Sequence, residues 1–331
     1  MLRRHLLAAT SGLALPALAP GRRADAQGVA WPARGPIRLV ATFPPGGFVD
    51  TMTRLIAPVL GGAVGQTVVV ENRAGAAGVV GTDYVAKQPA DGYTFLMTHA
   101  VVFVYAVATL PSVPFDPVGD FTHLGMLVDA PVILMVRAAS PFRTLGDLLA
   151  AARTRPVRYA TSGPGSQPHM MGAMLTSLAG VPQFEHAPYT GSAPGLRDLL
   201  GGHIESMFDP ITTNVQALRD GSLRALAVST ARRLDALPDI PTFAEQGFPD
   251  LVQGQWIGLS APKNLPAPIA TRMMEVIPRL VANPTVLERA QALVTLPRDP
   301  TPVGADFVNV IRQELEVART VARRFNIMGT A

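Results

Sequence analysis

The sequence predicts an α/β protein, because β-branched apolar runs alternate with helical patterns along the chain. The first run, IRLVATF at 37–43, is followed by a segment in which Met52, Ile56 and Leu60 have the spacing of one buried helix face. TVVVEN and YTFLMT are the next two strand candidates, separated by a glycine-rich turn and a short helical pattern. Alternation of this kind predicts a mostly parallel sheet covered by helices.

The rest of the chain continues this alternation. Residues 121–136 form a long apolar run, and strand candidates follow at VRYATSG, FEHAPYTG, IESMFD, LRALAVS and QWIGLSAP. The C-terminal third is helical, with Phe307, Ile311 and Leu315 in the helical period. The apolar stretch 95–110 is interrupted by polar residues, so we expect a strand and then a loop or helix, not a membrane span.

Residues 1–26 resemble an export signal. A basic start, MLRRH, precedes the apolar stretch LLAATSGLALPALA, and ADA before Gln27 fits a small-residue cleavage site. Arg3 and Arg4 leave both the general secretory and the twin-arginine routes open. Four of the 28 basic and one of the 24 acidic residues lie in this segment, so the remainder is nearly neutral and no nucleic-acid partner is expected.

Enzyme motifs are missing from the sequence. There is no cysteine, no G-x-S-x-G, no H-E-x-x-H and no phosphate-binding G-x-x-x-x-G-K-[ST]. The histidines lack metal-ligand spacing, and GAAGVVG has Ala77 where a dinucleotide fingerprint requires glycine. We therefore expect neither catalysis nor a metal or cofactor.

Two loops share the pattern of a strand, a Pro/Gly-rich turn and a helix: VATFPPGGFVDTM at 40–52 and VRYATSGPGSQPHMM at 157–171. A helix N-terminus has unpaired N–H groups and partial positive charge, which suit a carboxylate. Glycine lets such a ligand approach the backbone. The pair predicts a site that holds a small anion from two sides.

Each residue of these loops also has a simpler interpretation. Either loop alone is more often an ordinary turn, and His169 alone is more often a capping or packing residue. The methionines at 170, 171 and 174 fit a core, and Asp209 fits a cap of the next helix. Only the pairing of the two loops favours a binding site.

The sequence resembles the tripartite tricarboxylate transporter substrate-binding receptors, also called Bug proteins, over nearly all of 36–327. The matching segments are FPPGGFVD, VVVENRAGAAGVVGTDYVAKQPADGYTFLM, FDPVGDFTHLG, YATSGPGS with His169, APYTGSAPGLRDLLGGHIESMFD, LRALAVSTARRLDALPDIPTFAEQGF and WIGLSAP. The resemblance implies a periplasmic receptor with the type II periplasmic-binding-protein fold. It has two α/β lobes, two chain crossovers and a ligand cleft between the lobes.

The resemblance also implies the domain limits and the site. The lobes are expected at 36–126 plus 253–331 and at 127–252, after a signal peptide at 1–26. The expected ligand-binding residues are Phe43, Pro45, Gly46, Gly47 and Asp50 in one lobe, Ser162, Gly163, Gly165, Ser166 and His169 in the other, and Gly78, Thr98, Tyr189 and Asp209 along the cleft.

Two positions depart from the family pattern. Phe48 and Val49 stand where small or polar residues are usual, and Ala173 stands where an acid is common. A Phe48 ring in the cleft would favour a less polar or aromatic ligand, whereas a ring packed on a lobe would not. Ala173 loosens the link to tricarboxylates.

The main hypothesis is therefore a monomeric periplasmic receptor that captures a small organic carboxylate for a membrane permease. Citrate, dicarboxylates, amino acids, nicotinate and aromatic acids are all candidate ligands. One alternative is a carboxylate receptor for a sensor protein, and a weaker one is an exported hydrolase that would show turnover.

Overall fold

The computed structural model describes residues 31–295, 297, 298, 300–324 and 327. The predicted signal peptide at 1–26 lies outside the described residues. The strands are β1 (Ile37–Ala41), β2 (Val68–Asn72), β3 (Thr94–His99), β4 (Phe121–Arg137), β5 (Val157–Thr161), β6 (Phe184–Pro188), β7 (Ser206–Pro210), β8 (Leu223–Val228) and β9 (Gly254–Pro262).

Helices follow most of the strands. The α-helices are α1 (Phe48–Val64), α2 (Val79–Ala86), α3 (Val107–Thr109), α4 (Leu145–Ala152), α5 (Gln167–Ala179), α6 (Ser192–Gly201), α7 (Val215–Arg219), α8 (Ala267–Val281), α9 (Pro284–Ala292) and α10 (Ala305–Arg324). Short 3₁₀ or π turns are η1 (Ala76–Gly78), η2 (Val101–Ala106), η3 (Ile211–Thr213), η4 (Ala244–Gln246) and η5 (Pro249–Leu251). The prediction of a strand and then a loop or helix at 95–110 is confirmed, because β3 is followed by the helical turns η2 and α3.

The sheet is mixed rather than mostly parallel. In the described part of the chain its order is β2-β1-β3-β9-β4-β7-β5-β6, and β8 also pairs with β4. β1 is parallel to β2 and β3, and β5 is parallel to β6 and β7. The long strands β4 and β9 are antiparallel to their neighbours, and they join the two parallel groups.

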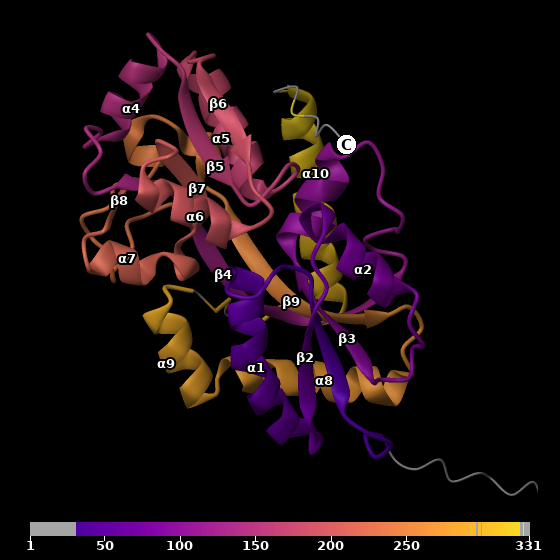
Figure 1. Cartoon of the computed structure of the whole chain (residues 1–331). Helices are drawn as coiled ribbons and strands as arrows, with labels where there is room; N and C mark the ends of the chain where they lie inside the picture. Colours follow the sequence, from indigo (N-terminus) through magenta and orange to yellow (C-terminus); the bar gives the residue numbers. More distant parts are fainter. Residues whose placement is uncertain (1–30, 296, 299, 325–326, 328–331) are drawn as a thin grey trace, which may run out of the picture. The chain divides into compact units, whose positions relative to one another are not determined.

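β4 and β9 are the crossovers of the chain (Figure 1). Residues 121–131 of β4 pair with β9, and residues 132–137 pair with β7 and β8. The long apolar run seen in the sequence is thus a single strand shared by both groups, buried on both faces along most of its length and therefore mostly apolar. The lobe limits at 126/127 and 252/253 stay a prediction.

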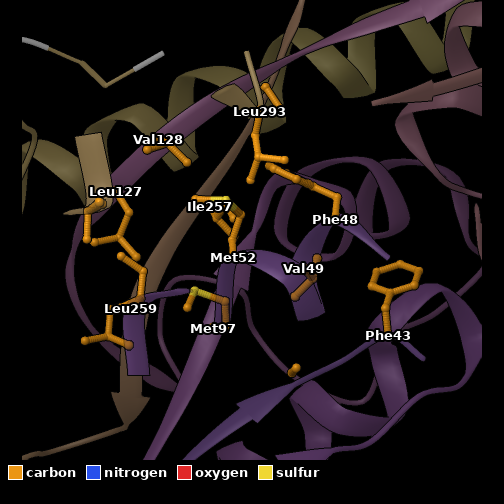
Figure 2. Close-up of a cluster of buried hydrophobic side chains, with 14 of the residues drawn as sticks. Phe43, Phe48, Val49, Met52, Met97, Leu127, Val128, Ile257, Leu259 and Leu293 are labelled. Atoms are coloured by element: carbon orange, nitrogen blue, oxygen red, sulfur yellow. The ribbon is translucent and has the colours of Figure 1, made fainter. Parts of the chain in front are cut away.

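The first helix packs as its periodicity predicts. Met52, Ile56 and Leu60 are fully buried. Figure 2 shows Met52 among side chains of the sheet, including Met97 of β3 and Ile257 of β9. Burying each of these side chains contributes about 1.5–3 kcal/mol. α1 is thereby fixed on the sheet, with its first turn at the carboxyl end of β1.

Candidate ligand-binding site

The loop between β1 and α1 ends in an uncapped helix N-terminus. Gly47 is the N-cap residue of α1, and no side chain hydrogen bonds to this end of the helix. The N–H groups of Phe48 and Val49 have no acceptor within the helix, because the i−4 carbonyls lie outside it. Such groups, together with the helix dipole, favour an anion.

The side chain of Asp50 stabilises this loop through hydrogen bonds. Its carboxylate accepts hydrogen bonds from the N–H of Gly46 at 2.9 Å, from Nε of Arg54 at 2.9 Å and from Nδ2 of Asn72 at 2.8 Å. Burial raises the pKa of Asp50, but the hydrogen bonds from Arg54, Gly46 and Asn72 outweigh burial, and the pKa is lowered. Asp50 is therefore ionised at neutral pH and orders the glycine turn.

The loop between β5 and α5 uses its own donors. The N–H of Gly165 donates to Nδ1 of His169 at 3.2 Å, and the N–H of His169 donates to Oγ of Ser166, the N-cap residue, at 3.3 Å. The hydroxyl of Ser166 donates to the carbonyl of Gly163 at 2.7 Å, and the N–H of Gly163 donates to Oγ1 of Thr161 at 3.3 Å. This helix N-terminus is thus already capped.

His169 is part of a buried ring pair. Its ring stacks on that of His186 with centroids 4.0 Å apart and planes 18° apart. Burial lowers the pKa of His169 to about 4, and burial together with the His169 ring lowers the pKa of His186 to about 3. The geometry agrees with the capping and packing role that the sequence allowed for His169, and its role as a ligand contact stays a prediction.

A second uncapped N-terminus belongs to α6. Gly191 is its N-cap residue and no side chain caps it. Ser192 Oγ donates to the carboxylate of Asp209 at 2.5 Å, and Asp209 also accepts from Thr213 Oγ1 at 2.6 Å and Asn214 Nδ2 at 2.8 Å. Burial raises the pKa of Asp209 to about 6, although all three hydrogen bonds favour the ionised form. Asp209 thus holds the first turn of α6, whereas Asp50 holds the loop that precedes α1.

The N-termini of α1 and α6 line one hollow. Its wall consists of Phe43, Pro44, Pro45, Gly47, Phe48, Val49, Ser162, Gly191, Ser192, Ala193, Pro194, Pro210 and Gln255. A Cβ atom at Gly191 would lie 3.6 Å from Cδ of Pro44, so the two loops meet at the rim. The cavity volume of the hollow is about 30 Å³. One bound water needs a cavity of roughly 10–15 Å³ on the same measure.

Eleven of the fourteen predicted residues fall into three groups. Phe43, Pro45, Gly47 and Ser162 line the hollow. Gly46, Asp50 and Asp209 lie behind the two helix N-termini, and Gly163, Gly165, Ser166 and His169 shape the capped loop. None of the residues in the second and third groups is part of the wall of the hollow.

Gly78, Thr98 and Tyr189 are also placed outside the wall. Gly78 has a φ of 95°, and a Cβ atom there would lie 3.0 Å from Oγ1 of Thr42. Thr98 is fully buried in β3, and the hydroxyl of Tyr189 donates to Asp198 at 2.7 Å. Their contact with a ligand stays a prediction.

Phe48 combines both interpretations offered for it. Its side chain is 4% exposed and belongs to the core cluster around α1, and it also lines the hollow. Figure 2 shows it pointing toward Leu293, while Phe43 stands at the edge of the cluster. Phe48 therefore gives the hollow an apolar wall that is anchored in the core.

Sequence reasoning missed several wall residues. These are Pro44, Val49, Gly191, Ser192, Ala193, Pro194, Pro210 and Gln255. The segment APYTGSAPG contains a third strand–glycine–helix pattern, which could have revealed α6. Gln255 had no local signal, because its position depends on the crossing of β9 with β4.

The described residues contain no group of three or more His, Cys, Asp or Glu arranged to hold a metal ion. In the same part of the chain no helix combines the length and the apolarity needed to span a bilayer.

Comparison with solved structures defines the class of protein as a periplasmic solute-binding protein. The structure resembles periplasmic binding protein BugD with a TM-score of 0.85, at 29% identity, over 90% of this chain and 100% of BugD. It resembles R. palustris Rpa4515 with adipate with the same TM-score of 0.85, at 31% identity, over 90% of this chain and 99% of that one.

The family follows from the sequence comparisons. Residues 52–300 match the model of the tripartite tricarboxylate transporter family receptor. Protein BugT of Bordetella pertussis is 34% identical over 297 residues, which cover 89% of this chain and 88% of BugT. The chain therefore belongs to the tripartite tricarboxylate transporter receptor family, whose members are periplasmic, and the resemblance noted in the sequence is confirmed.

Proposed function

We propose that this protein is a periplasmic receptor that captures a small organic carboxylate and delivers it to the permease of a tripartite transporter. It acts without catalysis, as a monomer, after export by its N-terminal signal. Its family and the adipate-bound structure of a relative support a carboxylate ligand. The observation that carries the proposal is the convergence of two uncapped helix N-termini, those of α1 and α6, on one hollow.

In this proposal the carboxylate binds to backbone N–H groups of both first turns. Phe48 and Val49 contribute from α1, and Ser192 and Ala193 contribute from α6, whereas the N–H of Gly47 donates to the Pro44 carbonyl at 3.5 Å. Hydrogen bonds to a charged group contribute roughly 1.5–3 kcal/mol each. Three or four of them at about 2–3 kcal/mol therefore suffice for the about −8 kcal/mol of a micromolar complex without a basic side chain.

The two predicted lobes close over the ligand by bending at the crossover strands. The pairing of β4 changes from β9 to β7 and β8 between Pro131 and Val132. The hollow lies beside this point, since Gln255, opposite Ala130, and Pro210, opposite Val132, are both in its wall. Opening at these strands would separate Pro44 from Gly191 and admit the ligand.

Gly47→Leu tests the site. Gly47 has a φ of −82°, which any residue adopts, and a Cβ atom there meets only the Pro44 carbonyl at 3.6 Å. Gly46, with a φ of 86°, would instead be strained by any side chain. The matched control is Gly62→Leu, at an exposed position of the same helix with open space around it.

Both variants and the wild type are refolded to remove bound ligand and screened against carboxylates by thermal shift. A ligand at a hundred times its Kd adds about 2.7 kcal/mol of stability. We expect this shift in the wild type and in Gly62→Leu, and its loss in Gly47→Leu, whose side chain fills the hollow. An equal shift in both variants would exclude the α1 N-terminus from the site.

A further inference from the structure

Gln255 is a buried polar residue in the wall of the hollow whose side chain hydrogen bonds to none of the described residues. It is 4% exposed and lies on β9 opposite Ala130 of β4, at the crossover of the chain. Its Oε1 is buried without a partner, and its Nε2 makes no hydrogen bond with the described residues. Among the unpartnered buried side-chain atoms of the described residues, this is the one that belongs to the wall of the hollow.

A neighbouring glutamine is paired at one end of its amide. Nε2 of Gln167 donates to the hydroxyl of Tyr105 at 2.9 Å and to the carbonyl of Gly254 at 2.8 Å, while its Oε1 is buried without a partner. That amide anchors α5 to the first residue of β9. Gln255, the next residue of β9, keeps its whole carboxamide free, although buried polar groups in proteins are nearly always paired. A partner from outside the chain is therefore expected.

The wall of the hollow also limits the charge of that partner. No Lys, Arg, His, Asp or Glu is part of it. The carboxylates of Asp50 and Asp209 lie directly behind the two helix N-termini, where they bond Gly46 and Ser192. Burying a second or third carboxylate here would lack a compensating positive charge. The site thus favours a ligand with a single negative charge.

Most of the remaining wall is apolar. Phe43, Phe48 and Val49 come from the α1 side, and Pro194 and Pro210 from the opposite side. The free polar side-chain groups of the wall are the amide of Gln255 and the hydroxyl of Ser162, since Ser192 already donates to Asp209. A ligand whose body contacts these apolar side chains gains the most binding free energy if that body is itself apolar.

From these observations we infer that Gln255 determines specificity by hydrogen bonding to an uncharged polar group of the ligand, and that the ligand is a monocarboxylate with an apolar body and a hydroxyl-type substituent. The inference rests on the proposed carboxylate receptor and names its substrate class. Both ends of a carboxamide can hydrogen bond to a hydroxyl group, because Oε1 accepts a hydrogen bond and Nε2 donates one.

The test uses two matched pairs of acids, 4-hydroxybenzoate with benzoate and 3-hydroxybutyrate with butyrate, together with adipate and citrate. Affinities are measured by calorimetry for the wild type and for Gln255→Met, which keeps the side-chain length without the amide. Gln253→Leu is the control, because it removes a carboxamide two residues earlier that is not in the wall of the hollow. Gln255→Glu places a negative charge in the hollow.

We expect at least one hydroxy acid to bind the wild type about 10-fold or more tighter than its partner acid, and tighter than adipate and citrate. In Gln255→Met this preference falls to 3-fold or less, in Gln253→Leu it is unchanged, and Gln255→Glu loses all the acids. Tighter binding of adipate or citrate, or an unchanged preference in Gln255→Met, would overturn this inference and leave the receptor intact. No binding of any acid to the wild type would overturn the proposed function with it.

Discussion

The hydroxyl of Ser192 donates a hydrogen bond of 2.5 Å to the carboxylate of Asp209, which ties the first turn of α6 to the end of β7. Asp209 is fully buried and receives two further hydrogen bonds, from Thr213 and Asn214. The N–H groups of α6 that face the hollow thus owe their position to a carboxylate that does not itself line it.

The coupling of these two residues is the first prediction. Ser192→Ala removes a hydrogen bond to a charged group and should lower the free energy of unfolding by about 1.5–3 kcal/mol. In an Asp209→Asn background the same change should cost at least ~1 kcal/mol less, because contacting residues are not additive. Denaturant unfolding of the four proteins measures this difference. Ser177→Ala, at an exposed helix position, should stay within about 0.5 kcal/mol of the wild type, and additive effects would disprove the coupling.

The second prediction concerns pH. Burial raises the pKa of Asp209 from an ordinary 3.8 to about 6, so the folded protein binds this proton more tightly than the unfolded chain. The wild type should therefore become more stable relative to Asp209→Asn as pH falls from about 6 to 4, by up to about 1.4 kcal/mol per pH unit. Above pH 7 the difference should be constant.

Unfolding in urea at several pH values measures this difference. Asp220→Asn is the control, because hydrogen bonds with Ser222 lower the pKa of that exposed carboxyl. The advantage of the wild type over this variant should shrink as pH falls, which is the opposite direction. A flat difference for Asp209→Asn would mean that its carboxyl has an ordinary pKa in the folded protein.

Local patterns predicted the elements well because their causes are local. The period of Met52, Ile56 and Leu60 reflects one buried face of α1. The antiparallel crossing of β4 and β9 could not be predicted, because residues 121–137 are mostly apolar on both faces and show no alternation that would signal register or direction. The prediction of a mostly parallel sheet, which rested on the alternation of strands and helices, was therefore wrong, and the sheet is mixed.

The site shows the same limit. Both predicted loops have the same local pattern, but Ser166 and His169 cap one of them while the other is left open. A serine directly before a helical pattern, as at Ser166, is a capping signal that the sequence contained. Gln255 and Pro210 reach the hollow only through strand pairing, which no short segment encodes.

Two serines of the second loop give the last prediction. Ser166 caps α5 and does not line the hollow, whereas Ser162 lines the hollow and its hydroxyl bonds to no described residue. Ser166→Ala should therefore lower the free energy of unfolding by about 1 kcal/mol and change ligand affinity less than 2-fold. Ser162→Ala should leave stability within about 0.5 kcal/mol and weaken binding several-fold.

Each variant is the control for the other, since both remove one hydroxyl from the same loop. Denaturant unfolding and calorimetry with the tightest carboxylate found for the wild type give the two readouts. The reverse result, with binding lost in Ser166→Ala and kept in Ser162→Ala, would return the anion to the N-terminus of α5. It would mean that the capping hydrogen bonds of Ser166 and His169 break when the ligand binds. The N–H groups of this loop would then donate to the ligand carboxylate and no longer to side chains of the protein.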